Sequence, residues 1–182
     1  MLIAITGASG ISLAVKLLET LKLKGIKTEL IISKIAKKLI TIETDYKQID
    51  IQKLAYKTYD VDDLTAGPAS GSYLIDAMVI IPCSMKTLAA IANGYADNLI
   101  TRAADVMIKE KRKLILVVRE SPFSAIHLEN MLKLARLGVI IAPPIPSYYI
   151  KPTSVNELNE YFVGRILDHI GIKSDIKRWG DE

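Results

Sequence analysis

Residues that could bind a small anion follow five short hydrophobic runs of the sequence. The turn 7–10 follows the first run, Ser33 the second, residues 84–87 the third, Arg119 with Glu120 the fourth, and the loop 143–149 the fifth. Small hydroxyl residues and free amides at the start of a helix favour a phosphate, because unsatisfied N–H groups and the helix dipole both attract an anion. The pattern therefore predicts a site for a small anionic ligand.

Each of these features, taken alone, has a simpler explanation. The turn 7–10 is neither a full dinucleotide fingerprint nor a P-loop with its lysine, and tight strand–helix packing explains it equally well. Ser33 alone suits a plain N-cap, and Cys83 suits a small buried hydrophobic residue better than a nucleophile. Arg102 and Lys109 share one face of a helix, which is typical of a solvated, ion-paired surface. No single one of these motifs therefore identifies a function, and only their combination can do so.

The elements that position these residues alternate between strand and helix, which predicts an α/β fold with a doubly wound parallel sheet. The continuous hydrophobic runs are typical of buried parallel strands. Residues 45–67 are polar and lack a clear period, so we expect them to lie outside the sheet. We expect one domain over residues 1–182, with a polar C-terminal tail from about residue 172. The predicted strands are 2–6, 29–32, 77–81, 114–118 and 138–141, and the predicted helices are 11–23, 34–44, 85–92, 99–111, 124–137 and 154–170.

Composition excludes several classes of function. The net charge of +4 comes from 24 basic residues spread against 20 acidic ones without an aromatic–basic repeat, so we expect no nucleic-acid partner. One cysteine and two histidines predict neither a disulfide nor a metal cluster. No hydrophobic run is long enough to span a membrane. The first residues read as a strand rather than a secretory leader, so a cytoplasmic location is expected.

Eight short blocks occur in an order that resembles the UbiX-type flavin prenyltransferases, and the resemblance spans nearly the whole chain. One block could arise by chance, but the ordered set is specific to that family. The blocks are TGASG (6–10), IETD (42–45), PASGS (68–72), PCSMKT (82–87), DNLITRAAD (97–105), VRESP (118–122), HLENM (127–131) and RWG (178–180).

The resemblance implies a flavodoxin-like Rossmann fold that binds FMN between the subunits of a dodecamer. It also implies a reaction in which reduced FMN is alkylated at N5 and C6 by dimethylallyl phosphate, without a metal. The product, prenylated FMN, would serve as the cofactor of a UbiD-type decarboxylase.

The resemblance also implies roles for individual residues. Ser9 and Glu43 would relay protons beside the flavin, and Glu120 would act as an acid or base beside the donor phosphate. Clustered cations and a tyrosine hydroxyl would stabilise the leaving phosphate. The implied FMN contacts are Gly7, Ala8, Ser9, Ser33, Ser84, Met85, Lys86, Thr87 and Arg119. The implied contacts of dimethylallyl phosphate are Arg102, Lys109, Glu120, Tyr149, Arg165 and Trp179.

Three segments depart from the family pattern. The family often has a small residue and another glycine where this chain has residues 11–14, so the flavin edge is expected to pack differently there. The segment 45–61 is short, and Ser147 with Tyr148 replaces a common Gly-Phe pair before Tyr149. These changes bear on the shape of the pocket and on subunit contacts, and they leave every reactive residue in place.

Two other functions are compatible with the same fold class. A flavin-dependent decarboxylase of peptidyl or pantothenoyl cysteine would carry a histidine in the N-terminal half, whereas the first histidine here is His127. A non-catalytic FMN carrier would need no cations beyond those that hold the flavin phosphate. Lys109, Arg165 and Glu120 argue against that alternative.

Overall fold

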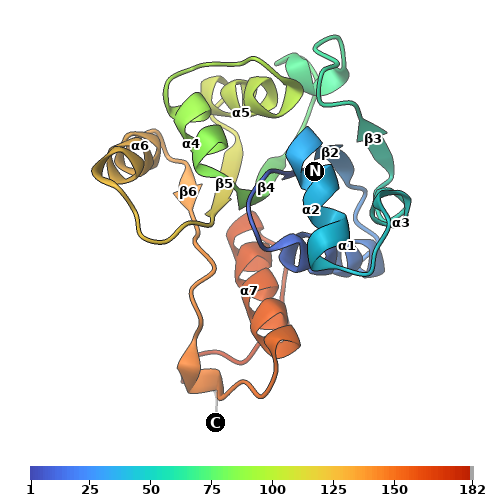
Figure 1. The fold of residues 1–182 in the computed structure, drawn as a ribbon, viewed down its shortest axis with the longest axis vertical. Helices are drawn as coiled ribbons and strands as arrows, with labels where there is room; N and C mark the ends of the chain where they lie inside the picture. Colours follow the sequence, from blue (N-terminus) through green and yellow to red (C-terminus); the bar gives the residue numbers. More distant parts are fainter. Residues whose placement is uncertain (181–182) are drawn as a thin grey trace.

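The computed structural model describes residues 1–180 and contains one six-stranded, all-parallel sheet (Figure 1). The strand order is β3-β2-β1-β4-β5-β6, so the chain reverses direction across the sheet between β1 and β4. In a doubly wound sheet this switch point opens a crevice at the carboxyl ends of the strands. The strands are β1 (Leu2–Ile5), β2 (Glu29–Ile32), β3 (Lys57–Tyr59), β4 (Ala77–Cys83), β5 (Lys113–Val118) and β6 (Ile140–Ile141).

Helices cover both faces of the sheet, as the sequence predicted. Ile3 and Ile5 of β1 pack in one hydrophobic cluster with α1, α2 and α7, while Leu2 and Ala4 pack in another with α4, α5 and α6. Figure 1 shows α4 and α5 on one side of the sheet and α1 and α7 on the other. The helices are α1 (Ile11–Leu23), α2 (Lys34–Glu43), α3 (Gln48–Gln52), α4 (Met85–Ala92), α5 (Leu99–Lys109), α6 (Ala125–Arg136) and α7 (Val155–Ile170), with 3₁₀ turns η1 (Gly67–Ala69) and η2 (Tyr148–Ile150).

A buried threonine joins β1 to β4 at the switch point. The Thr6 hydroxyl donates to the carbonyl of Pro82 at 2.7 Å and accepts from the amide of Ser84 at 2.8 Å. Because Thr6 is only 1% exposed, these bonds form away from water, where an unpaired polar group would be costly. Thr6 therefore fixes the spacing between the turn after β1 and the start of α4.

The prediction that residues 45–67 lie outside the sheet is wrong for residues 57–59. These residues form β3, which pairs in parallel with β2 at the edge of the sheet. Lys57 and Thr58 are exposed, so β3 carries no continuous hydrophobic run that the sequence could reveal. The five predicted strands alone have the flavodoxin order, and β3 extends that sheet by one strand.

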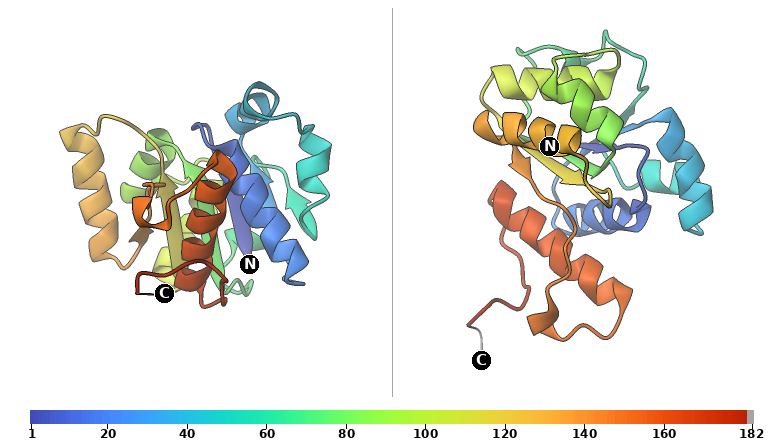
Figure 2. Two further views of the ribbon diagram at one scale, coloured as in Figure 1. Left: turned by 90° about the horizontal axis from the view of Figure 1, so that it is seen from below. Right: turned by 60° about the vertical axis from the view of Figure 1, so that its left-hand side comes forward.

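The C-terminal tail is more ordered than its polar sequence suggested. Residues 172–180, called the strap below, follow α7 and pack back against it (Figure 2). Residues 181–182, which also belong to the predicted tail, lie outside the described residues. Within residues 1–180, no helix has both the length and the hydrophobicity to cross a membrane.

Candidate functional site

A cavity of about 550 Å³ lies at the carboxyl ends of β1, β2 and β4, and we call it the strand-end cavity. Three helices begin at its wall, with Ser33, Ser84 and Asn98 as the N-caps of α2, α4 and α5. Each cap side chain accepts from a backbone amide of its own helix, at 3.2 Å for Ser33, 3.3 Å for Ser84 and 3.0 Å for Asn98. Three positive helix ends facing one cavity favour an anion there.

Seven of the sequence-predicted site residues line the strand-end cavity: Gly7, Ser33, Ser84, Met85, Lys86, Thr87 and Glu120. Gly7 leaves room that no other residue would leave, because a Cβ atom there would stand 2.7 Å from Cγ2 of Ile35 at the start of α2. The close approach of the turn to α2 therefore requires glycine at this position.

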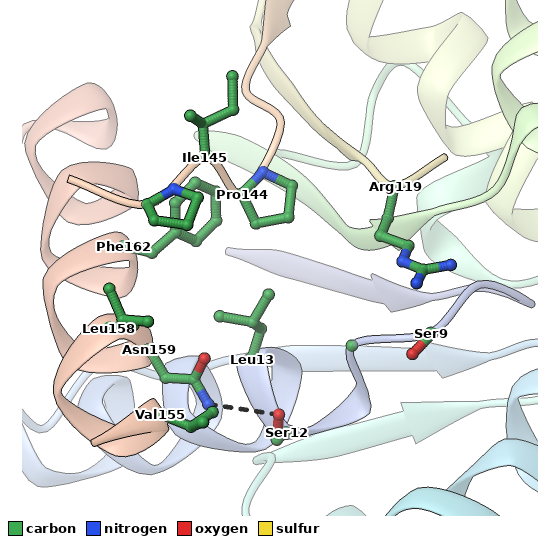
Figure 3. Close-up of a pocket in the computed structure, with 12 residues that line it drawn as sticks. Ser9, Ser12, Leu13, Arg119, Pro144, Ile145, Val155, Leu158, Asn159 and Phe162 are labelled. Carbon is green, nitrogen blue, oxygen red and sulfur yellow. Dashed lines mark hydrogen bonds between the residues drawn. The ribbon is translucent and has the colours of Figure 1, made fainter. Parts of the chain in front are cut away.

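A second pocket of about 240 Å³, the apolar pocket, lies on the other side of the turn 7–10 (Figure 3). Ser9 and Arg119 lie at one side of it, and Leu158 and Phe162 of α7 lie at the other. Together with the strand-end cavity, this pocket offers a polar, anion-binding end and a hydrophobic end separated by one turn of backbone. Such a pair suits a ligand with a phosphate at one end and a flat ring at the other. Ala8, between Gly7 and Ser9, lines neither space.

The predicted proton relay residue Glu43 caps a helix in this structure. Its Oε2 accepts from the amides of Gly10 at 2.8 Å and Ile11 at 3.0 Å. Gly10 is the N-cap of α1 and has no side chain to bind these amides, so the carboxylate from the end of α2 does so instead. Glu43 therefore stands beside the turn 7–10 with a structural role that its sequence position did not reveal.

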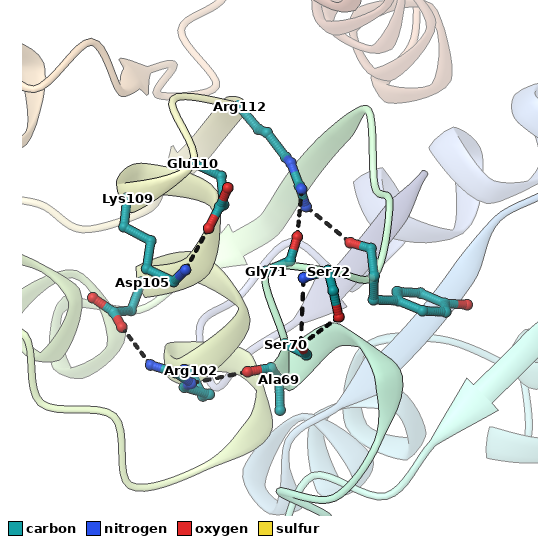
Figure 4. A network of polar contacts seen from close by, with 10 residues as sticks. Ala69, Ser70, Gly71, Ser72, Arg102, Asp105, Lys109, Glu110 and Arg112 are labelled. Carbon is teal, nitrogen blue, oxygen red and sulfur yellow. Dashed lines mark hydrogen bonds and ion pairs between the residues drawn. The ribbon is translucent and has the colours of Figure 1, made fainter.

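The predicted donor contacts on α5, Arg102 and Lys109, form a first group, the α5 group (Figure 4). Arg102 donates from Nε to the carbonyl of Ala69 at 3.0 Å and pairs with Asp105 at 2.8 Å. Lys109 pairs with Glu110, and this pair lowers the pKa of the Glu110 carboxyl. Both cations remain partly exposed and line neither the strand-end cavity nor the apolar pocket.

Tyr149, Arg165 and Trp179 form a second group, the C-terminal group. The hydroxyls of Tyr149 and Tyr161 lie 2.5 Å apart, and the Trp179 ring stands edge-on to Tyr149 with a centroid distance of 5.2 Å. The hydrogen bond with Tyr161 raises the pKa of Tyr149. Arg165 lies 3.5 Å from Asp168.

The two groups that were predicted to share one donor pocket lie apart in a single chain. Figure 1 places α5 at one end of the long axis of the molecule and the segment before α7 at the other end. Figure 2 shows the same separation from another side. No contact between the two groups is found among residues 1–180.

Two reactive residue types have structural roles here. Cys83 is fully buried, and this burial raises the pKa of its thiol far above the usual range. His127 belongs to a capping box at the start of α6, where its Nδ1 accepts from the amide of Ser124 and its own amide donates to the Ser124 hydroxyl. Among the described residues, no three His, Cys, Asp or Glu side chains are grouped to hold a metal ion.

Sequence reasoning missed several residues that line these spaces. Lys34 and Asp62 form an ion pair of 2.6 Å at the strand-end cavity, which raises the pKa of Lys34. Lys34 could have been found because it follows Ser33, whereas Asp62 lies in the segment 45–67, for which only a place outside the sheet was predicted. Phe162 lines the apolar pocket because α7 packs against α1, which no local pattern indicates. Pro144, by contrast, lies in the loop 143–149, which the sequence had marked as following a strand.

Comparisons with known proteins assign this arrangement to a family. A family model described as Flavoprotein matches residues 1–167. The chain is 53% identical to the mitochondrial flavin prenyltransferase PAD1 of Saccharomyces cerevisiae, over 97% of this chain and 74% of that protein. It is also 53% identical to flavin prenyltransferase UbiX of Methanocaldococcus jannaschii, over 98% of this chain and 97% of that protein.

Solved structures of similar proteins match over the same length of the chain. AnUbiX (PadA1), in complex with FMN and dimethylallyl pyrophosphate, superposes with a TM-score of 0.96 at 46% identity, covering 98% of this chain and 95% of that chain. A dodecameric FMN-dependent UbiX-like decarboxylase from Escherichia coli O157:H7 gives 0.96 at 47% identity, covering 98% and 97%. The peptidyl-cysteine decarboxylase EpiD gives 0.63 at 21% identity, covering 80% and 81%, which indicates a shared fold alone.

Proposed function

The chain belongs to the flavoprotein family and, within it, to the UbiX-type flavin prenyltransferases, and from this premise we propose that it joins a dimethylallyl group to reduced FMN. The family resemblance predicted from the eight sequence blocks is confirmed. The proposed donor is dimethylallyl phosphate and the proposed product is prenylated FMN.

The observation that carries this proposal is the pairing of the strand-end cavity with the apolar pocket across the turn 7–10. We propose that the flavin phosphate binds where α2, α4 and α5 begin and that the ring system lies toward Ser9 and Arg119. Hydroxyls of Ser33, Ser84 and Thr87 and the free amides beside them provide donors for the phosphate oxygens. The remaining proposed FMN contacts are Gly7, Ala8, Met85 and Lys86.

FMN supplies the nucleophilic N5 and C6 positions that take up the five-carbon unit as phosphate departs. The protein has to stabilise the negative charge that develops on that phosphate, and cations that bind it more tightly in the transition state lower the barrier. We propose that Arg102, Lys109 and Arg165 supply this charge and that the Tyr149 hydroxyl donates a hydrogen bond. Trp179 would flank the donor. No metal is part of the proposal.

The reaction would release a proton from C6 of the flavin, and residues of this chain would have to accept it. We propose that Ser9 and Glu43 relay this proton at the turn 7–10, and that Glu120 acts as acid or base beside the phosphate. Glu120 lines the strand-end cavity.

The separation of the α5 group from the C-terminal group supports a site that is completed between chains. We propose that this protein assembles as a homo-oligomer, with a dodecamer as the specific form, and that the donor lies between an α5 group and a C-terminal group of different chains. We further propose one catalytic domain over residues 1–182, a cytoplasmic location, and delivery of the product to a UbiD-type decarboxylase.

Incubation of the pure protein with reduced FMN and dimethylallyl phosphate tests the proposal, with mass spectrometry of the released flavin as the readout. We expect a flavin that has gained one five-carbon unit. Parallel reactions with oxidised FMN, with dimethylallyl diphosphate and with the Lys109→Ala protein serve as controls. If reduced FMN is bound yet gains no five-carbon unit from either donor, the proposed function is wrong.

A further inference from the structure

Asp168 of α7 holds the strap through several hydrogen bonds. Arg178 donates to Oδ2 of Asp168 at 2.8 Å and to Oδ1 at 3.0 Å, so the two side chains form a two-point ion pair. The hydroxyl of Ser174 donates to Oδ1 at 2.8 Å. Bidentate pairs between guanidinium and carboxylate are strong and directional. The Asp168 side chain is only 20% exposed, which limits screening by water.

A close contact fixes the strap to α7 one helical turn earlier. Gly164 lies in the middle of α7, where glycine is unfavourable for a helix by about 1 kcal/mol relative to alanine. Its missing side chain leaves the space that Ile176 occupies, and a Cβ atom at Gly164 would collide with Cγ2 of Ile176. The strap therefore crosses α7 where the absence of a side chain at Gly164 leaves room for Ile176.

The strap carries Trp179 to the C-terminal group. Trp179 follows Arg178 directly, and its ring packs edge-on against Tyr149 although the side chain remains 81% exposed. Tyr149 in turn packs edge-on against Tyr161 of α7, with ring centroids 6.0 Å apart. A large aromatic side chain held in place and yet exposed is suited to contact a ligand or another chain.

The ion pair between Asp168 and Arg178 also affects how Arg165 interacts with Asp168. Asp168 lies one turn beyond Arg165 on α7, and the 3.5 Å between Arg165 Nη1 and Asp168 Oδ2 is too long for a good hydrogen bond. Arg178 occupies the same oxygen at 2.8 Å. Arg165 is therefore held to Asp168 by a long ion pair alone, and its guanidinium, 47% exposed, can also contact an outside anion.

We propose that Asp168 is a positioning residue for the prenyl-donor phosphate, which it serves by anchoring the strap that carries Trp179 and by pairing with Arg178 so that Arg165 remains available. The inference rests on the proposed function, because it takes the C-terminal group as a binding site for that phosphate. Asp168 itself does not contact the donor.

The single tryptophan of the chain makes the anchor directly observable. We expect Asp168→Asn to increase the local mobility of Trp179, measured by time-resolved fluorescence anisotropy. The same variant is expected to raise the KM for dimethylallyl phosphate about tenfold while the Kd for FMN stays unchanged. Asp175→Asn is the matched control: it makes the same change of charge within the strap, at an exposed residue with no side-chain hydrogen bond or ion pair found among residues 1–180.

A steric variant tests the same anchor without altering any charge. Gly164→Ala is expected to displace Ile176, to loosen Trp179 and to raise the donor KM as Asp168→Asn does. Adding Ile176→Ala to Gly164→Ala removes the collision and should restore both measurements. Thermal unfolding of every variant distinguishes a loosened strap from a destabilised fold.

Unchanged Trp179 anisotropy in both Asp168→Asn and Gly164→Ala would show that Asp168 does not anchor the strap. A loosened Trp179 with an unchanged donor KM would overturn the positioning role. If wild-type protein prenylates no flavin, the proposed function fails instead. The change in Trp179 anisotropy on addition of inorganic phosphate, compared between wild type and Asp168→Asn, then decides whether the anchor shapes an anion site. Equal responses of the two proteins to phosphate would overturn the inference.

Discussion

The Glu43 side chain joins two parts of the molecule that are distant in sequence. Its carboxylate binds the first amides of α1, and it reaches them from the last residue of α2. A carboxylate at a helix N-terminus is stabilising through both hydrogen bonds and the helix dipole. The proposed proton relay and the cap involve the same carboxylate, so different substitutions of Glu43 are needed to distinguish the two roles.

Glu43→Gln and Glu43→Ala are expected to differ. The glutamine oxygen can still accept from the amides of Gly10 and Ile11, so we expect Glu43→Gln to change the free energy of unfolding by less than about 0.5 kcal/mol. Glu43→Ala leaves the amides without this partner and should cost roughly 1 kcal/mol. Urea unfolding measures both, with Glu129→Gln, an exposed residue of α6, as the control.

Prenylation rates then test the chemistry of the same residue. Glutamine cannot take up a proton as a carboxylate does, so we expect Glu43→Gln to lower turnover at least tenfold with FMN still bound. Full turnover in the glutamine variant would leave Glu43 with the capping role alone.

Titration of the Asp168 carboxyl predicts the direction in which the anchoring of the strap changes with pH. Hydrogen bonds from Arg178 lower the pKa of the Asp168 carboxyl from 3.8 to about 2, and Ser174 and Arg165 act in the same direction. The other titratable neighbour is Tyr161, which is neutral. Because the pKa of Asp168 is lower in the folded protein, the stabilisation that its carboxylate provides is complete at pH values above the unfolded-state pKa. This stabilisation is lost as the pH falls through the folded-state pKa. We expect the strap to stay anchored at pH 4 and to loosen toward about pH 2.

Trp179 anisotropy measured against pH checks this expectation, with far-ultraviolet circular dichroism recorded in parallel to detect global unfolding. The Asp168→Asn protein should show no such transition in this range. A transition of equal size in that variant would assign it to another group.

At the scale of secondary structure, the turn after β1 packs tightly against the start of α2. The only residue type that fits position 7 is glycine, because Ile35 of α2 faces it. Ser33, the N-cap of α2, lies in the same cavity wall. A shift of α2 would therefore move one of the three helix ends that favour an anion.

Gly7→Ala is expected to raise the Kd for FMN about tenfold, because the new methyl group has to displace Ile35 and with it the first turn of α2. Quenching of flavin fluorescence on titration measures this affinity. The double variant Gly7→Ala, Ile35→Ala should recover most of the loss, and Ile35→Ala alone is its control. Failure of the double variant to recover would mean that Gly7 acts through its own contact with the flavin.

At the scale of the whole molecule, the separated α5 and C-terminal groups require a second chain if they are to meet one donor. Helix α6 also exposes Ile126, Leu128 and Leu132, each more than half accessible in the single chain. Large exposed hydrophobic side chains are often found on surfaces that associate. Both features agree with the proposed assembly.

Mixed assemblies test whether the donor site is shared. Lys109→Ala and Arg165→Ala proteins are each expected to lose most activity, yet a co-expressed mixture should recover roughly a quarter of wild-type activity, since some sites then take an intact residue from each chain. Prenylation of FMN by the purified mixture is the measurement. A mixture of Lys109→Ala with the Lys109→Ala, Arg165→Ala double variant is the control and should stay inactive. No recovery in the first mixture would contradict a shared site.

The sequence by itself determined the order of the elements and the cluster of residues at the strand ends. Hydrophobic runs and N-caps are local signals, and the carboxyl ends of parallel strands share one edge of the sheet, so these signals suffice to predict that Ser33 and Ser84 lie near Gly7. The α/β prediction with helices on both faces is confirmed. The short edge strand β3 was missed because an exposed strand lacks the hydrophobic run that marks a buried one.

Only the tertiary structure decided how distant segments meet. Glu43 caps Gly10 from 33 residues away, the strap crosses α7 at Gly164, and Asp168 pairs with Arg178. None of these contacts has a periodic or local signature, because each depends on where a helix or loop returns in space. The same reason explains the division of the predicted donor contacts into two groups: sequence order places residues along the chain, and folding alone decides which ends of the molecule they occupy.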